Sequence, residues 1–155
     1  MSVRLRVHKR IEASPQAVWD VLVDWPGQAR WIPLTQVEVT TEHDTGLGVR
    51  AQALSGFWCG RLPVGLLDNF VVTGWSPPAA GRAELEVLHL GPYFTGEGVF
   101  ALRQDGDHTV VTATEMINVP GGRVLDRLIR LALPLMRVGF GYSLGSLAKV
   151  VGRAA

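Results

Sequence analysis

The sequence is poor in the features that accompany disulfide bonding, nucleic-acid binding and membrane insertion. Cys59 is the only cysteine among 155 residues, so the chain cannot form an internal disulfide, as is usual in a reducing compartment. The formal net charge of +1 implies no nucleic-acid partner. Residues 138–148 form the longest uncharged run near the C-terminus; these 11 residues fall well short of the roughly 20 that cross a bilayer. We therefore expect a soluble, cytoplasmic protein without a transmembrane segment.

Motifs for nucleophilic, metal and phosphate chemistry are also missing. There is no G-x-S-x-G motif, and the four histidines, at positions 8, 43, 89 and 108, do not have the spacing of metal ligands. The glycine pairs at 46/48 and 96/98 do not open a helix after a strand, as a phosphate-binding loop would. We expect neither a metal ion nor a cofactor.

What the sequence does contain is typical of one globular unit. Hydrophobic residues make up 47% of the chain and charged residues 19%, which argues against disorder. No linker, repeat or low-complexity segment divides the chain. We expect a single domain over residues 1–155, because this length can bury one sizeable core.

The stretch from Ile11 to Pro33 is the most informative local pattern. It follows an alternating strand at 3–11 and opens a helix, in which Ser14 can act as the N-cap and Pro15 fits the first helical position. Ala17, Val18, Val21 and Leu22 then recur at three- and four-residue spacing, accompanied by Trp19 and Trp25. A second short helix is predicted after Pro26-Gly27, and it ends near Trp31.

Six further strands and one long helix are predicted downstream. The strands cover residues 37–41, 49–54, 68–75, 82–90, 93–104 and 108–119, and Ser76-Pro77-Pro78 is expected to end the third of them. The helix spans about 123–152 and is amphipathic, with a kink expected at Pro134. Its predicted inner stripe includes Leu128 and Leu135 and has small residues in the middle, at Gly139, Ser143 and Ser146. Small residues there indicate either close packing on the sheet or a ligand cavity.

Three segments carry a resemblance to a known superfamily. They are I-E-A-S-P-Q-A-V-W-D-V-L-V-D-W at 11–25 with W-I-P at 31–33, G-W-S-P-P at 74–78, and G-E-G-V-F-A-L at 96–102 followed by H-T-V-V-T-A-T-E at 108–115. Together with the element order they resemble the START/birch-pollen-allergen superfamily (SRPBCC), and within it the polyketide cyclase/dehydrase and lipid-transport subfamily. The resemblance implies an α+β helix-grip fold, in which a curved antiparallel seven-stranded sheet wraps around a long C-terminal helix and a cavity lies between them.

The segment 56–65 fits an entrance to such a cavity. It holds Phe57, Trp58, three glycines and Pro63, so it can present apolar surface and also move. An ordinary loop filled by its own aromatic side chains is the alternative interpretation.

Three polar residues are candidates for chemistry in the cavity. Strand alternation places His89 on the same face as Leu85 and Val87, where it could orient a ligand or transfer a proton, or else lie half-solvated at the strand end. If Glu115 faces inward, its carboxylate needs a partner or a raised pKa. Tyr142 could supply a hydroxyl from the helix or reach solvent.

The remaining candidates are walls of the cavity, although each of them could equally be ordinary core. The predicted ligand-binding set is Trp31, Phe57, Trp58, Phe70, His89, Phe100, Met116, Met136, Gly139 and Ser143.

Three functions are compatible with this sequence. The first is binding or carriage of a hydrophobic small molecule, lipid-like or aromatic and polyketide-like. The second is a polyketide aromatase/cyclase or dehydratase, in which His89, Glu115 and Tyr142 move protons. The third is a protein-interaction module with a filled core. The protein is expected to be a monomer or a homodimer. A fold by itself does not decide among these functions, because one fold hosts many.

Overall fold

The computed structural model describes residues 2–59 and 62–154, without the side chains of residues 2, 57–59, 62–63, 123, 125 and 126. The chain begins with a strand and two short helices and ends with a long helix. The elements are β1 (Ser2–Ile11), α1 (Pro15–Leu22), the 3-10 helix η1 (Pro26–Arg30), β2 (Thr35–Val39), β3 (Arg50–Cys59), β4 (Leu62–Ala79), β5 (Arg82–Pro92), β6 (Thr95–Asp105), β7 (His108–Asn118) and α2 (Arg123–Ala154).

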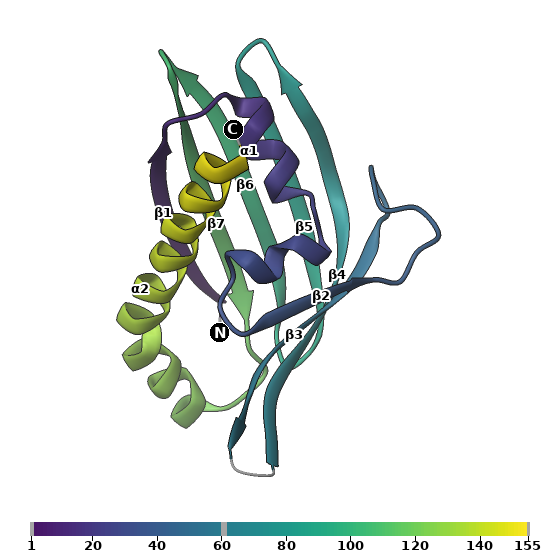
Figure 1. Ribbon diagram of the computed structural model, residues 1–155. Helices are drawn as coiled ribbons and strands as arrows, with labels where there is room; N and C mark the ends of the chain where they lie inside the picture. The colour runs from purple at the N-terminus through teal and green to yellow at the C-terminus, as the bar shows by residue number, and fades with distance from the viewer. Residues whose placement is uncertain (1, 60–61, 155) are drawn as a thin grey trace.

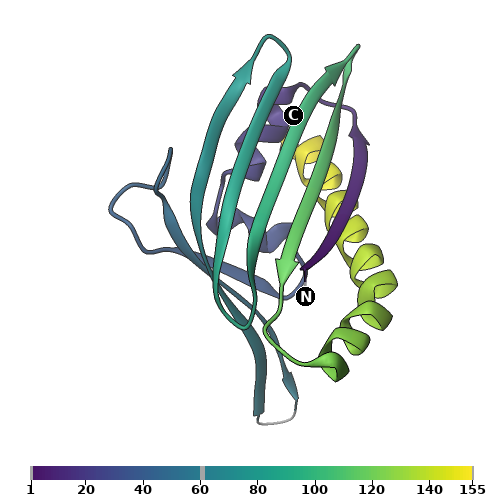
Figure 2. The same ribbon diagram turned by 180° about the vertical axis from the view of Figure 1, so that it is seen from behind.

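All seven strands join one curved antiparallel sheet in the order β1-β7-β6-β5-β4-β3-β2. β1 and β2 are consecutive in sequence but form opposite edges of the sheet. The chain between them, α1 and η1, must therefore cross the face of the sheet. Figures 1 and 2 show both of these helices and α2 on one side, the concave side, as in the helix-grip fold that the sequence resembles.

The start of α1 confirms the predicted capping signal. The side chain of Ser14 accepts a hydrogen bond from the backbone N–H of Ala17 at 3.2 Å, and Pro15 occupies the first turn. α1 turns Val18 and Leu22 completely inward. The residues that point into the concave side of the sheet, among them Leu85 and Val111, are buried against these helices and against the C-terminal half of α2.

Two strands extend further than the sequence predicts. β4 continues through Pro77-Pro78 to Ala79, although these prolines were expected to end it at Trp75. The register shifts between Ser76 and Ala79, so the prolines, which have no N–H to donate, lie outside the regular ladder. The predicted entrance loop at 56–65 is instead the paired ends of β3 and β4, with Gly56 opposite Gly65; residues 60–61, at its tip, lie outside the described part.

The predicted inner stripe of α2 is partly wrong. Leu128, Leu135 and Gly139 are exposed, whereas Ser143, Leu144 and Leu147 are buried. The helix carries two apolar rows, and the 3.6-residue period identifies rows without telling which one meets the sheet. α2 packs against α1 and β1. Its buried residues lie in the C-terminal half, whereas most described side chains of the N-terminal half are exposed.

The difference between the two halves of α2 gives a matched stability test. Leu147 is 0% exposed and Leu131 is 72% exposed on the same helix. We expect Leu147→Ala to lower the free energy of unfolding by about 2–5 kcal/mol, because it removes buried methyl groups and leaves a cavity. We expect Leu131→Ala to change it by less than about 0.5 kcal/mol. Urea denaturation of both variants measures this, and equal losses would contradict the structure.

Candidate functional site

A cavity of about 200 Å³ lies between the concave face of the sheet, η1 and α2. Its lining residues belong to η1, β2, β3, β4, β5, β6, β7 and α2, or lie next to one of these elements in the sequence. The lining residues are Trp25, Gln28, Trp31, Ile32, Thr35, Ala53, Ser55, Leu66, Asp68, Phe70, Leu85, Val87, His89, Phe94, Phe100, Glu115, Phe140 and Ser143.

The centre of this lining is a histidine held between two carboxylates. His89 Nδ1 lies 2.7 Å from Oδ2 of Asp68, and its Nε2 lies 3.2 Å from Oε2 of Glu115. Asp68 comes from β4, which pairs with β5 beside His89, but Glu115 comes from β7, one strand further away. The three side chains are only 12–13% exposed.

A glycine on the intervening strand β6 makes room for this contact. Gly96 stands opposite His89, and Gly98 stands opposite Glu115 in the sheet. A Cβ on Gly98 would lie 2.9 Å from Oε1 of Glu115 and from Cγ2 of Val87. Any larger residue at position 98 would therefore displace the Glu115 carboxylate, so the bare backbone of β6 lets β5 and β7 place His89 and Glu115 together.

The charge state of His89 follows from its neighbours. Burial alone lowers the pKa of the imidazole, but the hydrogen bonds to Asp68 and Glu115, together with their negative charges, outweigh burial and raise it from 6.5 to about 9. At neutral pH His89 is therefore an imidazolium whose two N–H groups both donate to carboxylates.

Aromatic rings form the rest of the walls. The His89 ring lies 5.2 Å from that of Phe94 and 6.4 Å from that of Phe70, centroid to centroid. Phe100 contacts Trp31 on one side and Phe140 of α2 on the other, at 6.4 and 6.3 Å. Rings at these distances make favourable edge and offset contacts, and the Phe94 ring lies within the range at which a cation is attracted to it.

Two buried polar atoms of lining residues have no partner among the described residues. They are Oδ1 of Asp68, an acceptor, and Nε1 of Trp31, a donor. Most buried polar groups in proteins are hydrogen-bonded, so such atoms need an explanation. Within a cavity, they are positions at which a bound molecule can form hydrogen bonds.

The structure brings half of the twelve predicted site residues together in the cavity. His89 faces inward as strand alternation predicted, and Glu115 shares the same face and has His89 as its partner. Of the predicted walls and candidates, those that line the cavity are Trp31, Phe70, His89, Phe100, Glu115 and Ser143.

Four predicted residues lie elsewhere. Tyr142 is 62% exposed on α2 and Gly139 is also exposed, so neither reaches the cavity. Met136 does not line it either, because α2 turns Phe140 and Ser143 inward instead. Met116 follows Glu115 in β7, and alternation turns it to the opposite face of the sheet. The side chains of Phe57 and Trp58 lie outside the described part of the structure.

Sequence reasoning missed Asp68, the strongest partner of His89. The signal was present, because Asp68 stands two residues before Phe70 and strand alternation places both on one face. Phe94 and Phe140 were also missed. Phe94 follows the end of β5, and Phe140 belongs to an apolar row of α2 that the predicted stripe did not include.

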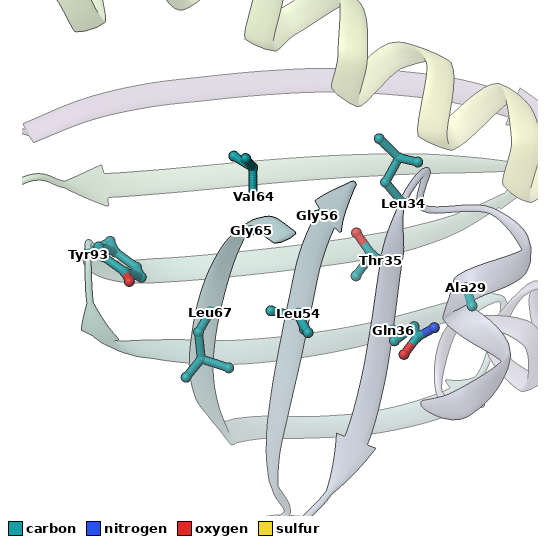
Figure 3. A pocket seen from close by; sticks show the side chains of 10 residues that line it. All are labelled: Ala29, Leu34, Thr35, Gln36, Leu54, Gly56, Val64, Gly65, Leu67 and Tyr93. Atoms are coloured by element: carbon teal, nitrogen blue, oxygen red, sulfur yellow. The ribbon is translucent and has the colours of Figure 1, made fainter. Parts of the chain in front are cut away.

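A second, larger depression of about 790 Å³ adjoins this cavity (Figure 3). It lies at the ends of β2, β3 and β4, with Tyr93 on its far side. Its lining includes the exposed residues Leu34, Leu54 and Val64, and it shares Thr35 with the smaller cavity. Among the residues that the structure describes, none that lines it is Asp, Glu, His, Lys or Arg, so we place the candidate site in the smaller cavity. The predicted entrance segment contributes Gly56, Val64 and Gly65 to this depression.

Comparison with known proteins places the chain in a family. Residues 2–152 match the family described as polyketide cyclase / dehydrase and lipid transport. The chain belongs to this family. A comparison with curated protein sequences found no significant match.

Among the described side chains, no group of three or more His, Cys, Asp and Glu residues is arranged to hold a metal ion.

Solved structures share the fold of this family member over almost its full length. A protein from Thermus thermophilus is 19% identical with a TM-score of 0.75, and the match covers 99% of each chain. The Zhui aromatase/cyclase from a Streptomyces species is 16% identical with a TM-score of 0.68, covering 99% of this chain and 95% of the other. Norcoclaurine synthase from Thalictrum flavum, as a point mutant with a transition-state analogue, is 14% identical with a TM-score of 0.66, covering 99% and 96%. At these identities the likeness shows the fold.

The raised pKa of His89 predicts how stability depends on pH. The folded state holds the His89 proton more tightly than the unfolded state, so this stabilisation is fully present below pH 6.5 and is lost as the pH rises through about 9. We expect a loss of about 3 kcal/mol in the free energy of unfolding between pH 5 and pH 10 from this group, which denaturant titrations at several pH values measure.

Matched variants separate the His89 contribution from other titrations. His43 is exposed, so His43→Gln should keep the decrease with pH, whereas His89→Gln should lose it. Asp68→Asn combined with Glu115→Gln removes the carboxylates instead and should also abolish the decrease, which covers the case in which His89→Gln does not fold. If the free energy of unfolding of the wild type and of all these variants depended on pH in the same way, His89 would not be held as an ion pair.

Proposed function

We propose that the protein binds a small aromatic molecule, about the size of one substituted ring, in the cavity beside His89. Membership of a family of cyclases, dehydrases and lipid transporters supports ligand binding or cyclase function in general. The observation that carries the narrower proposal is the cavity itself, in which aromatic walls surround one buried, charged cluster. Small-molecule sites commonly combine such walls with a few polar groups that fix orientation.

The volume of the cavity argues for a single ring. An engineered cavity of about 150 Å³ in another protein binds benzene, so about 200 Å³ accommodates a ring with small substituents. Pockets for drug-sized ligands are larger, about 300–1,000 Å³. A folded polyketide chain or a lipid acyl chain would require the cavity to expand, for example toward the adjoining depression near Thr35.

The polar groups favour a ligand that donates a hydrogen bond. Oδ1 of Asp68, a hydrogen-bond acceptor, is buried without a partner among the described residues. A buried acceptor without a partner costs about 1–3 kcal/mol, which a ligand hydroxyl or amine would offset. Nε1 of Trp31 is a buried donor without a partner among the described residues, so it favours a ligand that also carries a hydrogen-bond acceptor. Phenols and aromatic amines meet these requirements better than hydrocarbons do.

A second candidate function is proton-transfer catalysis of the cyclase or dehydratase type. The observation that favours it is the placement of two carboxylates in one cavity, each fixed by the His89 imidazolium. A carboxylate oxygen that faces a bound substrate can accept its proton, while the imidazolium offsets the negative charge. Tyr142 has no part in this version because it is exposed.

Binding of matched small aromatics tests the proposal. We expect 4-methylphenol to raise the melting temperature of the protein and to bind about tenfold more tightly than toluene, which has the same ring and methyl group but no donor. Calorimetric titration and thermal unfolding measure both effects. Asp68→Asn should reduce the preference for the phenol, because it removes a charged acceptor.

A pair of adjacent substitutions controls for non-specific binding. Ala53 lines the cavity, whereas Gln52 is exposed on the same strand. Ala53→Leu should abolish binding of 4-methylphenol by filling the cavity, and Gln52→Leu should leave it unchanged. If no single-ring compound binds, and native mass spectrometry of protein purified without denaturant finds no bound molecule, the proposed function is wrong.

A further inference from the structure

The N-terminal half of α2 carries a row of exposed, large apolar side chains that the core does not use. Their exposed fractions range from 57% to 77%, values that are typical of surface charges rather than of leucine and valine. The row consists of Val124, Leu128, Leu131, Leu135, Val138 and Tyr142.

This row is continuous along the helix. Its members recur at intervals of four and three residues, which places them on one side of a helix with 3.6 residues per turn. From Val124 to Tyr142 the row extends about 27 Å at a rise of 1.5 Å per residue. Phe140, which lines the cavity, lies on a different side of the same helical segment. An apolar surface of this extent on a soluble domain marks an interaction site.

The charges beside the row are positive. Arg127, Arg130 and Arg137 are all exposed and lie on the same side of the row, about 60°, 120° and 140° around the helix axis from its middle. Among the side chains that the structure describes between residues 124 and 142, no acidic one accompanies them, and by sequence the segment 123–142 contains four arginines and a single acid, Asp126. If two copies of the protein associated through this face, mainly arginines of one copy would therefore lie against arginines of the other.

We propose that this face of α2 binds an anionic phospholipid surface. The helix lies in the plane of the interface, its apolar row enters the boundary between headgroups and acyl chains, and Arg127, Arg130 and Arg137 contact the lipid phosphates. This combination of an apolar row and basic flank is the property that distinguishes interfacial helices. The helix stays at the surface: among the described residues, no helix is long and apolar enough to cross a bilayer.

The position of the row relates membrane binding to the cavity. Figures 1 and 2 show the N-terminal half of α2 and the β3–β4 hairpin at the same end of the molecule. Exposed Val64 and Leu66 on β4 add apolar surface there, and Leu66 also lines the cavity. The same helix that would lie on the lipid contributes Phe140 and Ser143 to the cavity. Docking would thus place the candidate site next to a phase in which apolar aromatic molecules concentrate.

Co-sedimentation of the full chain with vesicles tests this proposal. We expect binding to vesicles of phosphatidylcholine and phosphatidylglycerol in a 3:1 ratio, weaker binding in 0.5 M salt, and little binding to pure phosphatidylcholine. Arg127→Gln, Arg130→Gln and Arg137→Gln together should weaken binding to the anionic vesicles about a hundredfold, since each arginine contributes about fivefold. Leu131→Gln with Leu135→Gln should abolish binding by interrupting the apolar row.

The controls distinguish a lipid surface from the alternatives. Arg82→Gln with Arg103→Gln removes two exposed arginines that face each other on β5 and β6, at the end of the sheet opposite the start of α2, and should leave binding unchanged. Circular dichroism checks that the α2 variants stay folded. The proposal is overturned if the wild-type chain ignores anionic vesicles, or if it forms a dimer in solution that Leu131→Gln with Leu135→Gln dissociates without any vesicle binding. Binding of 4-methylphenol should survive in these variants, so this result is independent of the proposed function.

Discussion

The structure depends on covering the concave face of one curved sheet. Seven antiparallel strands turn alternate apolar side chains to that face, and these have to be removed from water. α1 covers part of the face with Val18 and Leu22, and the C-terminal half of α2 covers another part with Leu144 and Leu147. Hydrophobic contact between these helices and the sheet therefore determines the rest of the architecture.

The cavity exists because this cover is incomplete. The buried residues of α2 lie in its C-terminal half. Phe140 and Ser143, near the start of that half, are the α2 residues that line the cavity. The space that remains is lined by aromatic rings from the residues that flank η1, from β4, β6 and α2, and from the connection between β5 and β6. Its polar cluster tolerates burial because His89 neutralises much of the charge on two carboxylates, whereas an unpaired carboxylate at the same depth would be costly.

The two proposals concern the two sides of α2. Its inner side contributes to a cavity suited to one aromatic ring, and its outer side carries an apolar row with arginines beside it. The helix can have both functions because it extends beyond the sheet that it covers. Phe140 and Ser143 of the same helix line the cavity, so both proposed sites involve one structural element.

The sequence alone determined the elements and the faces of individual strands. Ser14-Pro15 predicted the start of α1, and alternation in β5 predicted that His89 faces inward, because capping and strand periodicity are local properties. Tertiary structure decided what local patterns leave open. Asp68 and Glu115 meet His89 through the register of three different strands, β4, β5 and β7. α2 has two apolar rows, and only packing could choose between them. For the same reason Tyr142 and Gly139 lie outside the cavity, and its volume follows from how the helix rests on the curved sheet.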